Sequence, residues 1–119
     1  MSKSVLKDKS FLFAIRIVNL YKIITETKRE FVISKQVYRS GTAIGALIRE
    51  AQNAESKLDF IHKLAIAQKE CDETMYWLEL LKATEYITPM EFDSISNDNL
   101  ELLKMLKSSI LTVKNSLKK

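Results

Sequence analysis

Residues 56–81 read SKLDFIHKLAIAQKECDETMYWLELL. Apolar side chains recur there every three or four residues, the spacing of one face of a helix. The main stripe comprises Phe60, Leu64, Ala67, Cys71, Leu78 and Leu81, with Ile61, Trp77 and Leu80 beside it. Ser56 followed by Asp59 resembles a capping box in which aspartate replaces the usual glutamate. The pattern predicts a helix that opens after Ser56 and ends near Thr84, about 28 residues and about 40 Å long.

The segments on either side of this run predict two further helices. One extends from about Val32 or Ser34 to near Ala54, with apolar positions Val37, Ile44, Leu47, Ile48 and Ala51. The other opens at Thr88-Pro89-Met90-Glu91, where threonine is the cap, proline the first helical residue and glutamate the third after the cap. Its seam comprises Phe92, Ile95, Asn99, Leu102 or Leu103, Leu106, Ile110, Val113 and Leu117. Asn99 interrupts this seam in the way that fixes register in coiled coils.

A fourth helix is predicted from about Ser10, a candidate cap, to Thr27, before a polar connection over 26–30. Two apolar stripes run along it: Phe11, Ala14, Ile15, Val18 and Tyr21, and Phe13, Ile17, Leu20 and Ile24. Together they cover more than one face. We therefore expect this helix to contact two neighbours, or one neighbour and another subunit.

Composition favours an all-α fold in a single domain, residues 1–119. The chain is 46% hydrophobic and has two Gly and one Pro, too few for the turns of a many-stranded β-protein. Short connections between long helices predict an antiparallel up-down-up-down four-helix bundle. The single thiol, Cys71, forms no internal disulfide, and the apolar run Phe11 to Ile15 is too short to span a membrane or form a signal peptide. We expect a cytoplasmic protein with no membrane association.

Charge is segregated along the chain. Residues 1–69 carry a net charge of +7, residues 70–101 carry −8, and residues 102–119 carry +5. Lysine and arginine displace counterions from phosphates, so the basic segments could bind RNA. The alternatives are that the lysines solubilise the helix faces, or that the acidic stretch meets a basic surface of another copy. Candidate contacts to nucleic acid or a partner are Lys35, Arg39, Arg49, Lys57, Lys63 and Lys69.

Residues that could carry catalysis or bind a metal are few. A di-iron bundle needs two histidines, and this chain has only His62. We expect no metal, no cofactor and no small-molecule substrate. The charged groups Glu50, Glu70 and Glu73 lie on segments that otherwise look buried, with Arg39 and Arg49 as candidate partners. An internal Arg–Glu network is the default interpretation and acid–base catalysis the weaker one. Trp77 belongs to the core or an interface, or else stacks on a base.

The two glycines, Gly41 and Gly45, share one face of the second helix. Each costs about 1 kcal/mol against alanine, which predicts the close approach of a facing helix. Arg39, Arg49 and Glu50 exclude a membrane seam.

Two blocks of sequence resemble the small four-helix proteins known as 23S rRNA intervening-sequence proteins. RSGTAIGA at 39–46 followed by Glu50-Ala51 is similar to the first block of that family. The second block is matched by Lys57, Asp59-Phe60, Lys63-Leu64, Lys69-Glu70, Glu73-Thr74 and Tyr76-Trp77-Leu78. Leu47 and Arg49 depart from it, standing where the family commonly has asparagine and a small residue. The residues of the signature that we single out are Arg39, Ser40, Gly41, Thr42, Gly45, Glu50, Glu70, Glu73 and Trp77.

The resemblance implies an antiparallel four-helix bundle that assembles as a homopentamer and is not an enzyme. The family it points to includes proteins encoded within insertions of large-subunit rRNA genes, and an accessory protein that binds a reverse transcriptase and nucleic acid. We therefore expect an oligomeric interaction module associated with RNA or an RNA-handling protein. The alternatives are a protein-binding scaffold, such as a reverse-transcriptase accessory factor, and an enzyme that uses Arg39, Glu50, Glu70 and Glu73.

Overall fold

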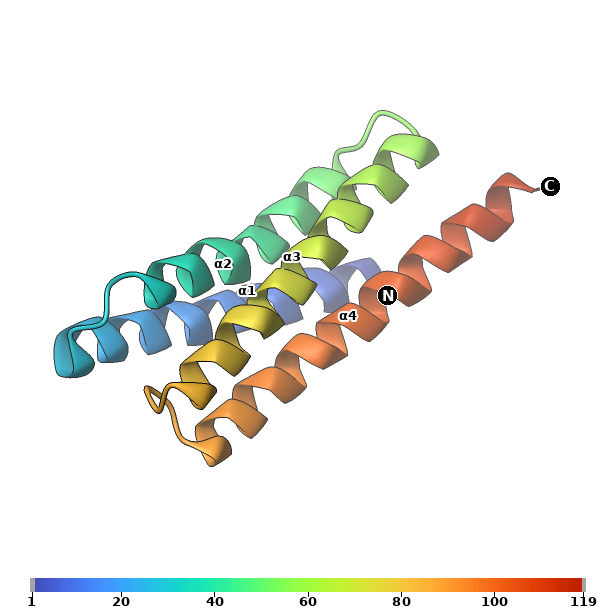
Figure 1. The fold of residues 1–119 in the computed structure, drawn as a ribbon. Coiled ribbons are helices and arrows are strands. Elements are labelled where there is room, and N and C mark those ends of the chain that lie inside the picture. The colour runs from blue at the N-terminus through green and yellow to red at the C-terminus, as the bar shows by residue number, and fades with distance from the viewer. Residues whose placement is uncertain (1, 119) are drawn as a thin grey trace.

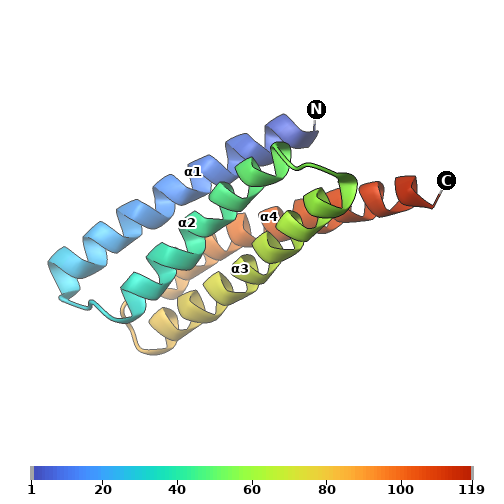
Figure 2. The same cartoon turned by 90° about the horizontal axis from the view of Figure 1, so that it is seen from above.

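The computed structural model describes residues 2–118, and their side chains from Val5 onward. Its elements are α1 (Ser2–Ile23), which continues into a π-helical turn η1 (Ile24–Lys28), α2 (Ile33–Gln52), α3 (Lys57–Ala83) and α4 (Pro89–Leu117). The four helices run antiparallel in up-down-up-down order, as predicted, within a bundle of 53 × 21 × 21 Å (Figure 1). Seen from above, α4 continues past the loop that joins α2 to α3 (Figure 2). No described helix contains a stretch apolar enough to cross a membrane.

The predicted capping box of α4 is confirmed, whereas at α3 only the serine half of the predicted box forms, because the Asp59 carboxylate accepts from the Glu55 N–H and not from that of Ser56. The Ser56 hydroxyl accepts a hydrogen bond from the Asp59 backbone N–H at 3.1 Å, which fixes the start of α3. At the start of α4, the Glu91 N–H donates to the Thr88 hydroxyl at 3.1 Å, and the Thr88 N–H donates to the Glu91 carboxylate at 2.8 Å. These reciprocal bonds satisfy backbone donors that a helix leaves free at its N-terminus.

The expected cap at Ser10 is wrong. Helix α1 begins eight residues earlier, and Ser10 lies buried inside it with its hydroxyl donating to the Lys7 carbonyl at 3.0 Å. The connection from α1 to α2 also differs from the expected one over 26–30, because the π-helical turn continues to Lys28. Arg29 takes a left-handed conformation, with φ of 56°, and this turns the chain toward α2. Glu30 then caps α2, because its carboxylate accepts from the backbone N–H groups of residues 32, 33 and 34 at 2.7 to 2.9 Å.

Gly41 and Gly45 let α1 approach α2 closely, as their spacing predicted. A Cβ atom at Gly41 would lie 2.7 Å from Cγ1 of the fully buried Ile17. A Cβ at Gly45 would lie 3.4 Å from the carbonyl and the hydroxyl oxygen of Ser10. Gly41 is therefore required sterically, whereas Gly45 has room for a methyl group.

Asn99 is fully buried between α3 and α4. Its Nδ2 donates to the Cys71 carbonyl at 2.9 Å, and its Oδ1 has no hydrogen-bond partner among the described residues. This bond joins the two helices at one register, the role expected of a polar residue in an apolar seam. Burial raises the pKa of the neighbouring Cys71 thiol to about 12, so this cysteine is a small core residue and not a nucleophile.

Candidate interaction surfaces

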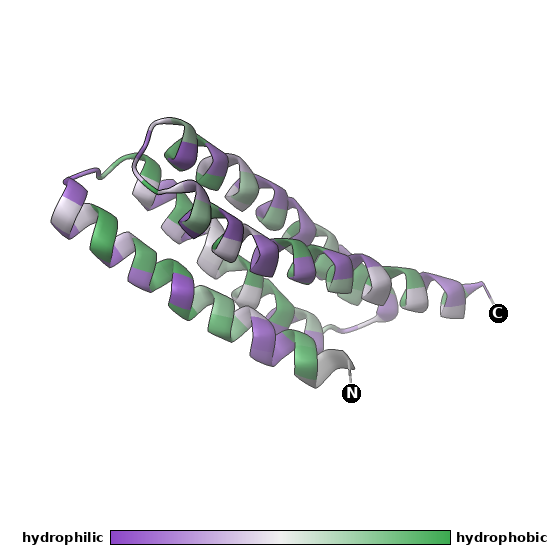
Figure 3. Cartoon of the chain, turned by 90° about the horizontal axis from the view of Figure 1, so that it is seen from below, coloured by the Kyte–Doolittle hydropathy of each residue, from purple (hydrophilic) through white to green (hydrophobic). Residues whose placement is uncertain are grey.

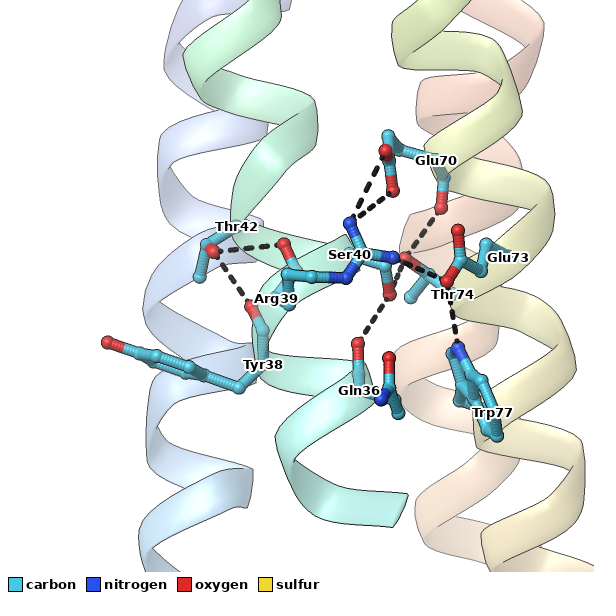
Figure 4. Close-up of polar contacts among 9 residues, drawn as sticks. All are labelled: Gln36, Tyr38, Arg39, Ser40, Thr42, Glu70, Glu73, Thr74 and Trp77. Atoms are coloured by element: carbon cyan, nitrogen blue, oxygen red, sulfur yellow. Dashed lines mark hydrogen bonds and ion pairs between the residues drawn. The ribbon is translucent and has the colours of Figure 1, made fainter. Parts of the chain in front are cut away.

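Several signature residues of α2 and α3 form a polar cluster across the junction of these helices (Figure 4). The Arg39 guanidinium binds the Glu70 carboxylate at 3.3 Å and, one turn along α3, the Glu73 carboxylate. Glu73 also accepts a hydrogen bond from Trp77 Nε1 at 3.2 Å. Glu70, Glu73 and Trp77 recur every three or four residues, so one arginine of α2 reaches this single face of α3.

Two hydroxyl groups lie beneath the ion pairs. The Ser40 and Thr74 oxygens are 2.9 Å apart and fully buried. The Ser40 hydroxyl also donates to the Gln36 carbonyl at 3.0 Å, and Thr74 lies 2.7 Å from the Glu70 carbonyl. Thr42, the neighbouring signature residue, lies 2.7 Å from the Tyr38 carbonyl on its own helix. These small hydroxyl residues satisfy each other and the backbone, which lets α2 and α3 pack closely without an unpaired polar group.

The electrostatics of the cluster are those of a structural ion pair. The hydrogen bond from Arg39, then the bond from Trp77, holds the pKa of Glu73 below its ordinary value. The hydrogen bond to Glu73 raises the pKa of Arg39. The expectation of an internal network is wrong in one respect, because the Arg39 side chain is 49% exposed. The cluster therefore joins two helices at the surface, where such a pair contributes little to stability.

The other sequence-predicted charges are scattered. Glu50 binds Lys63 at 3.2 Å and not the arginines expected from the sequence, since Arg49 lies over the Phe11 ring at 5.5 Å. Lys57 donates to the Ser116 hydroxyl at 3.2 Å. Two further candidates, Lys35 and Lys69, are exposed. The structure thus brings together Arg39, Glu70, Glu73 and Trp77 but does not bring the six candidate contact residues to one surface.

Metal ligands do not converge within the described part of the chain, where no group of three histidine, cysteine, aspartate or glutamate side chains is placed to hold an ion. His62 is exposed on the first turns of α3. The carboxylates of the polar cluster are tied to Arg39.

The outward face of α1 carries a group of exposed apolar side chains. Four large side chains of this helix are 43% to 61% exposed: Phe11, Leu12, Ile15 and Ile23. Hydrophobic residues recur along the whole of α1 (Figure 3). Between residues 11 and 21 the helix carries one charge, Arg16, and that charge is turned to α4, where it binds Asp98 at 2.6 Å and Ser94. The contact between α1 and α4 is otherwise the sparsest between neighbouring helices, which leaves the apolar face open.

The sequence interpretation missed two sets of residues. One comprises the carboxylates that α4 supplies to α1, where Asp98 binds Arg16 and Glu101 binds Lys9 at 3.1 Å. The other is the row of exposed lysines on the second half of α4. Both lie on α4, outside the two sequence blocks that carry the family resemblance. The heptad spacing of α4 could have placed them on its outer sides, but only the packing shows which helix faces them.

Known proteins resemble this chain along most of its length. The family model described as 23S rRNA-intervening sequence protein matches residues 2–108. A solved structure is similar to it with 59% sequence identity and a TM-score of 0.91, covering 92% of this chain and 98% of the other. That structure is a protein of unknown function from the S23 ribosomal protein family, from Bacteroides thetaiotaomicron. A search of curated proteins found no match.

Proposed function

This chain belongs to the 23S rRNA-intervening sequence protein family, and we propose on that basis that it is a non-catalytic, self-assembling interaction module associated with RNA. The observation that carries the proposal is the exposed apolar face of α1. Burying an apolar side chain gains about 25 cal/mol per Å², and monomers rarely expose contiguous patches of this kind. The occupant that we propose for the face is a second copy of the chain.

The assembly that we propose is a closed homo-oligomer. A surface that binds the next copy through a different patch generates a ring when the rotation closes. The family resemblance favours five subunits. In such a ring α1 would be buried on two sides, against α2 and α4 of its own subunit and against a neighbour, which accounts for a helix apolar over so wide an arc.

RNA association is supported by the charge distribution. The second half of α4 carries lysines and no carboxylate, whereas the acidic residues concentrate between 70 and 101. A ring repeats the basic segment once per subunit, and this raises the affinity for RNA, because linked sites increase the effective concentration of each contact. We propose a cytoplasmic location, in keeping with one buried, unpaired cysteine.

The second candidate is a protein-binding scaffold, such as an accessory factor of a reverse transcriptase. The acidic stretch 70–101 would then be the docking surface. Co-purification of a protein partner after nuclease treatment favours this alternative over RNA association. The enzyme alternative predicts that Glu70→Gln abolishes an activity, whereas our proposal predicts that the variant retains both fold and assembly.

The assembly is tested by size-exclusion chromatography of two charge-introducing variants. Leu12→Glu combined with Ile15→Glu places two carboxylates on the α1 face, and we expect dissociation into folded monomers. The matched control is Leu58→Glu combined with Met90→Glu, which alters two apolar residues that are even more exposed but lie outside α1. The proposal is wrong if both double variants elute like the wild type, or if the wild type itself elutes as a monomer.

A further inference from the structure

One side of α4 carries a continuous row of exposed residues, which we call the α4 basic stripe: Leu100, Lys104, Lys107, Leu111, Lys114 and Lys118. They are spaced by alternating steps of four and three residues, so they share one face of the helix. Each of them directly follows a residue of the apolar seam of α4 in the sequence. The stripe therefore lies beside the face of α4 that packs into the core, and not on that face. All six side chains are exposed.

The charges of the α4 basic stripe are unpaired within the described structure. None of its four lysines forms an ion pair with a described residue, whereas Lys9, Arg16, Arg39 and Lys63 all do. No aspartate or glutamate follows Glu101 in the sequence. Four free ammonium groups thus lie along about 21 Å of helix, from the rise of about 1.5 Å per residue.

The chemistry of the stripe fits a polyphosphate better than a protein. Protein interfaces are depleted of lysine at their centres, and they need a contiguous apolar core. Here lysines outnumber leucines, and Leu100 and Leu111 are separated by three turns. Interfaces with nucleic acid are strongly positive and largely composed of phosphate contacts. The two leucines, 42% and 59% exposed, distinguish the stripe from a purely solubilising face because they add apolar contact area without charge.

We propose that the α4 basic stripe binds the phosphate backbone of RNA, with each lysine contacting one phosphate. This inference rests on the RNA association proposed above and gives it a location. It differs from the six contacts expected from the sequence, of which Arg39 and Lys63 are already engaged by carboxylates. Lys57 bonds to Ser116, which lies two residues from both Lys114 and Lys118 and therefore on the other side of α4, so Lys57 is not part of the stripe. Lys114 and Lys118 lie beyond residue 108, where the family match ends.

The stripe makes a quantitative prediction about salt dependence. Each phosphate contact contributes about −0.7 to the slope of log K against log salt for single strands and about −0.9 for duplexes. Four contacts per binding subunit therefore give a slope of about −3 to −4. Near 0.1 M salt, the loss of three contacts corresponds to about a 100-fold loss of affinity.

The test compares two triple variants of equal net charge. Lys104→Gln, Lys107→Gln and Lys114→Gln remove three charges from the stripe. Lys7→Gln, Lys22→Gln and Lys28→Gln remove three exposed charges from α1 and the turn that follows it, none of them a candidate contact. Fluorescence anisotropy with a labelled RNA hairpin is measured over a salt series, in the oligomer as purified. We expect about 100-fold weaker binding and a slope closer to zero by two to three for the stripe variant, and less than a threefold change for the control.

The outcomes separate the stripe from RNA association as such. If the wild type binds RNA and both variants lose affinity equally, or neither loses it, the assignment of binding to the stripe is wrong. RNA association itself is then unaffected. The absence of wild-type binding even at low salt overturns both. Polyglutamate, an acidic polypeptide, serves as a competitor. If it displaces the RNA at an equal concentration of charge, the assignment to a phosphate backbone is wrong. Since all substituted lysines are exposed, unchanged circular dichroism and oligomer mass confirm that the variants are folded.

Discussion

Replacing Gly41 with alanine adds one methyl group where α2 meets α1. The new Cβ would lie 2.7, 2.9 and 3.0 Å from three side-chain carbons of Ile17, which is fully buried and therefore cannot swing aside. Overpacking of this kind costs about 1 to 3 kcal/mol, and the better helix propensity of alanine returns about 1 kcal/mol. We expect a net loss of stability of up to about 2 kcal/mol.

Gly45→Ala is the matched control, one turn along the same face. Its Cβ would lie 3.4 Å from Ser10, an ordinary contact, so the gain in helix propensity dominates. We expect this variant to be as stable as the wild type or more stable by up to about 1 kcal/mol. Opposite signs at two glycines four residues apart follow only if the Ile17 contact limits the approach of α1.

Urea unfolding of both variants, alone and with Ile17→Ala, measures the coupling. Removing the Ile17 carbons leaves space for the new methyl group, so Gly41→Ala should stabilise the Ile17→Ala background although it destabilises the wild type. Gly45→Ala should have the same effect in both backgrounds. The reasoning is refuted if Gly41→Ala changes the free energy of unfolding by the same amount in both backgrounds. It is also refuted if Gly41→Ala and Gly45→Ala change that free energy alike.

Three further predictions concern polar groups. Burial tends to raise the pKa of Glu30, but the backbone N–H groups that it caps outweigh this and hold the pKa below 4.5; its contribution is complete at neutral pH and is lost as the pH falls through the lowered folded-state pKa. Glu30→Gln should therefore lower the stability by about 0.5 to 2 kcal/mol at pH 7 and by less as the pH is lowered to 3 in thermal melts, and an equal loss at both pH values would contradict the cap. Arg39→Met should lower the free energy of unfolding by less than about 1 kcal/mol, and by still less at high salt, because the ion pair is half exposed. A larger loss in urea unfolding that does not depend on salt would indicate a buried network instead. Asn99→Leu should be as stable as the wild type or more stable, because it removes the unpartnered Oδ1 while the Cys71 carbonyl keeps its place in α3. A fall in melting temperature would show that the hydrogen bond from Asn99 Nδ2 stabilises the protein by more than the buried Oδ1 destabilises it.

Local signals explain which parts of the fold could be predicted. Ser56 and Thr88 cap helices through partners three residues away, so spacing alone identified them. The start of α1 was missed because residues 2–9 contain a single buried apolar side chain, Leu6, too few to establish a period. Glu30 was missed because its carboxylate caps α2 from outside the helix, after a left-handed turn at Arg29 that no residue type signalled.

The candidate surfaces depended more on tertiary packing. Glu70, Glu73 and Trp77 share a face by spacing, so their grouping was predictable. The pairing of Glu50 with Lys63, in place of the expected arginines, was not predictable, because it depends on the register of α2 against α3 and on the approach of Phe11 from α1. The α4 basic stripe has a readable period, but that period alone does not show that its lysines are exposed and unpaired.

The mass of the wild-type particle in solution tests the central claim most directly. Multi-angle light scattering over a range of protein concentrations measures it without any substitution. The exposed face of α1 predicts a defined multiple of the 13.7 kDa chain, five chains by the family resemblance, that persists on dilution. A particle of one chain mass at every concentration would contradict the claim that copies of this protein cover that face.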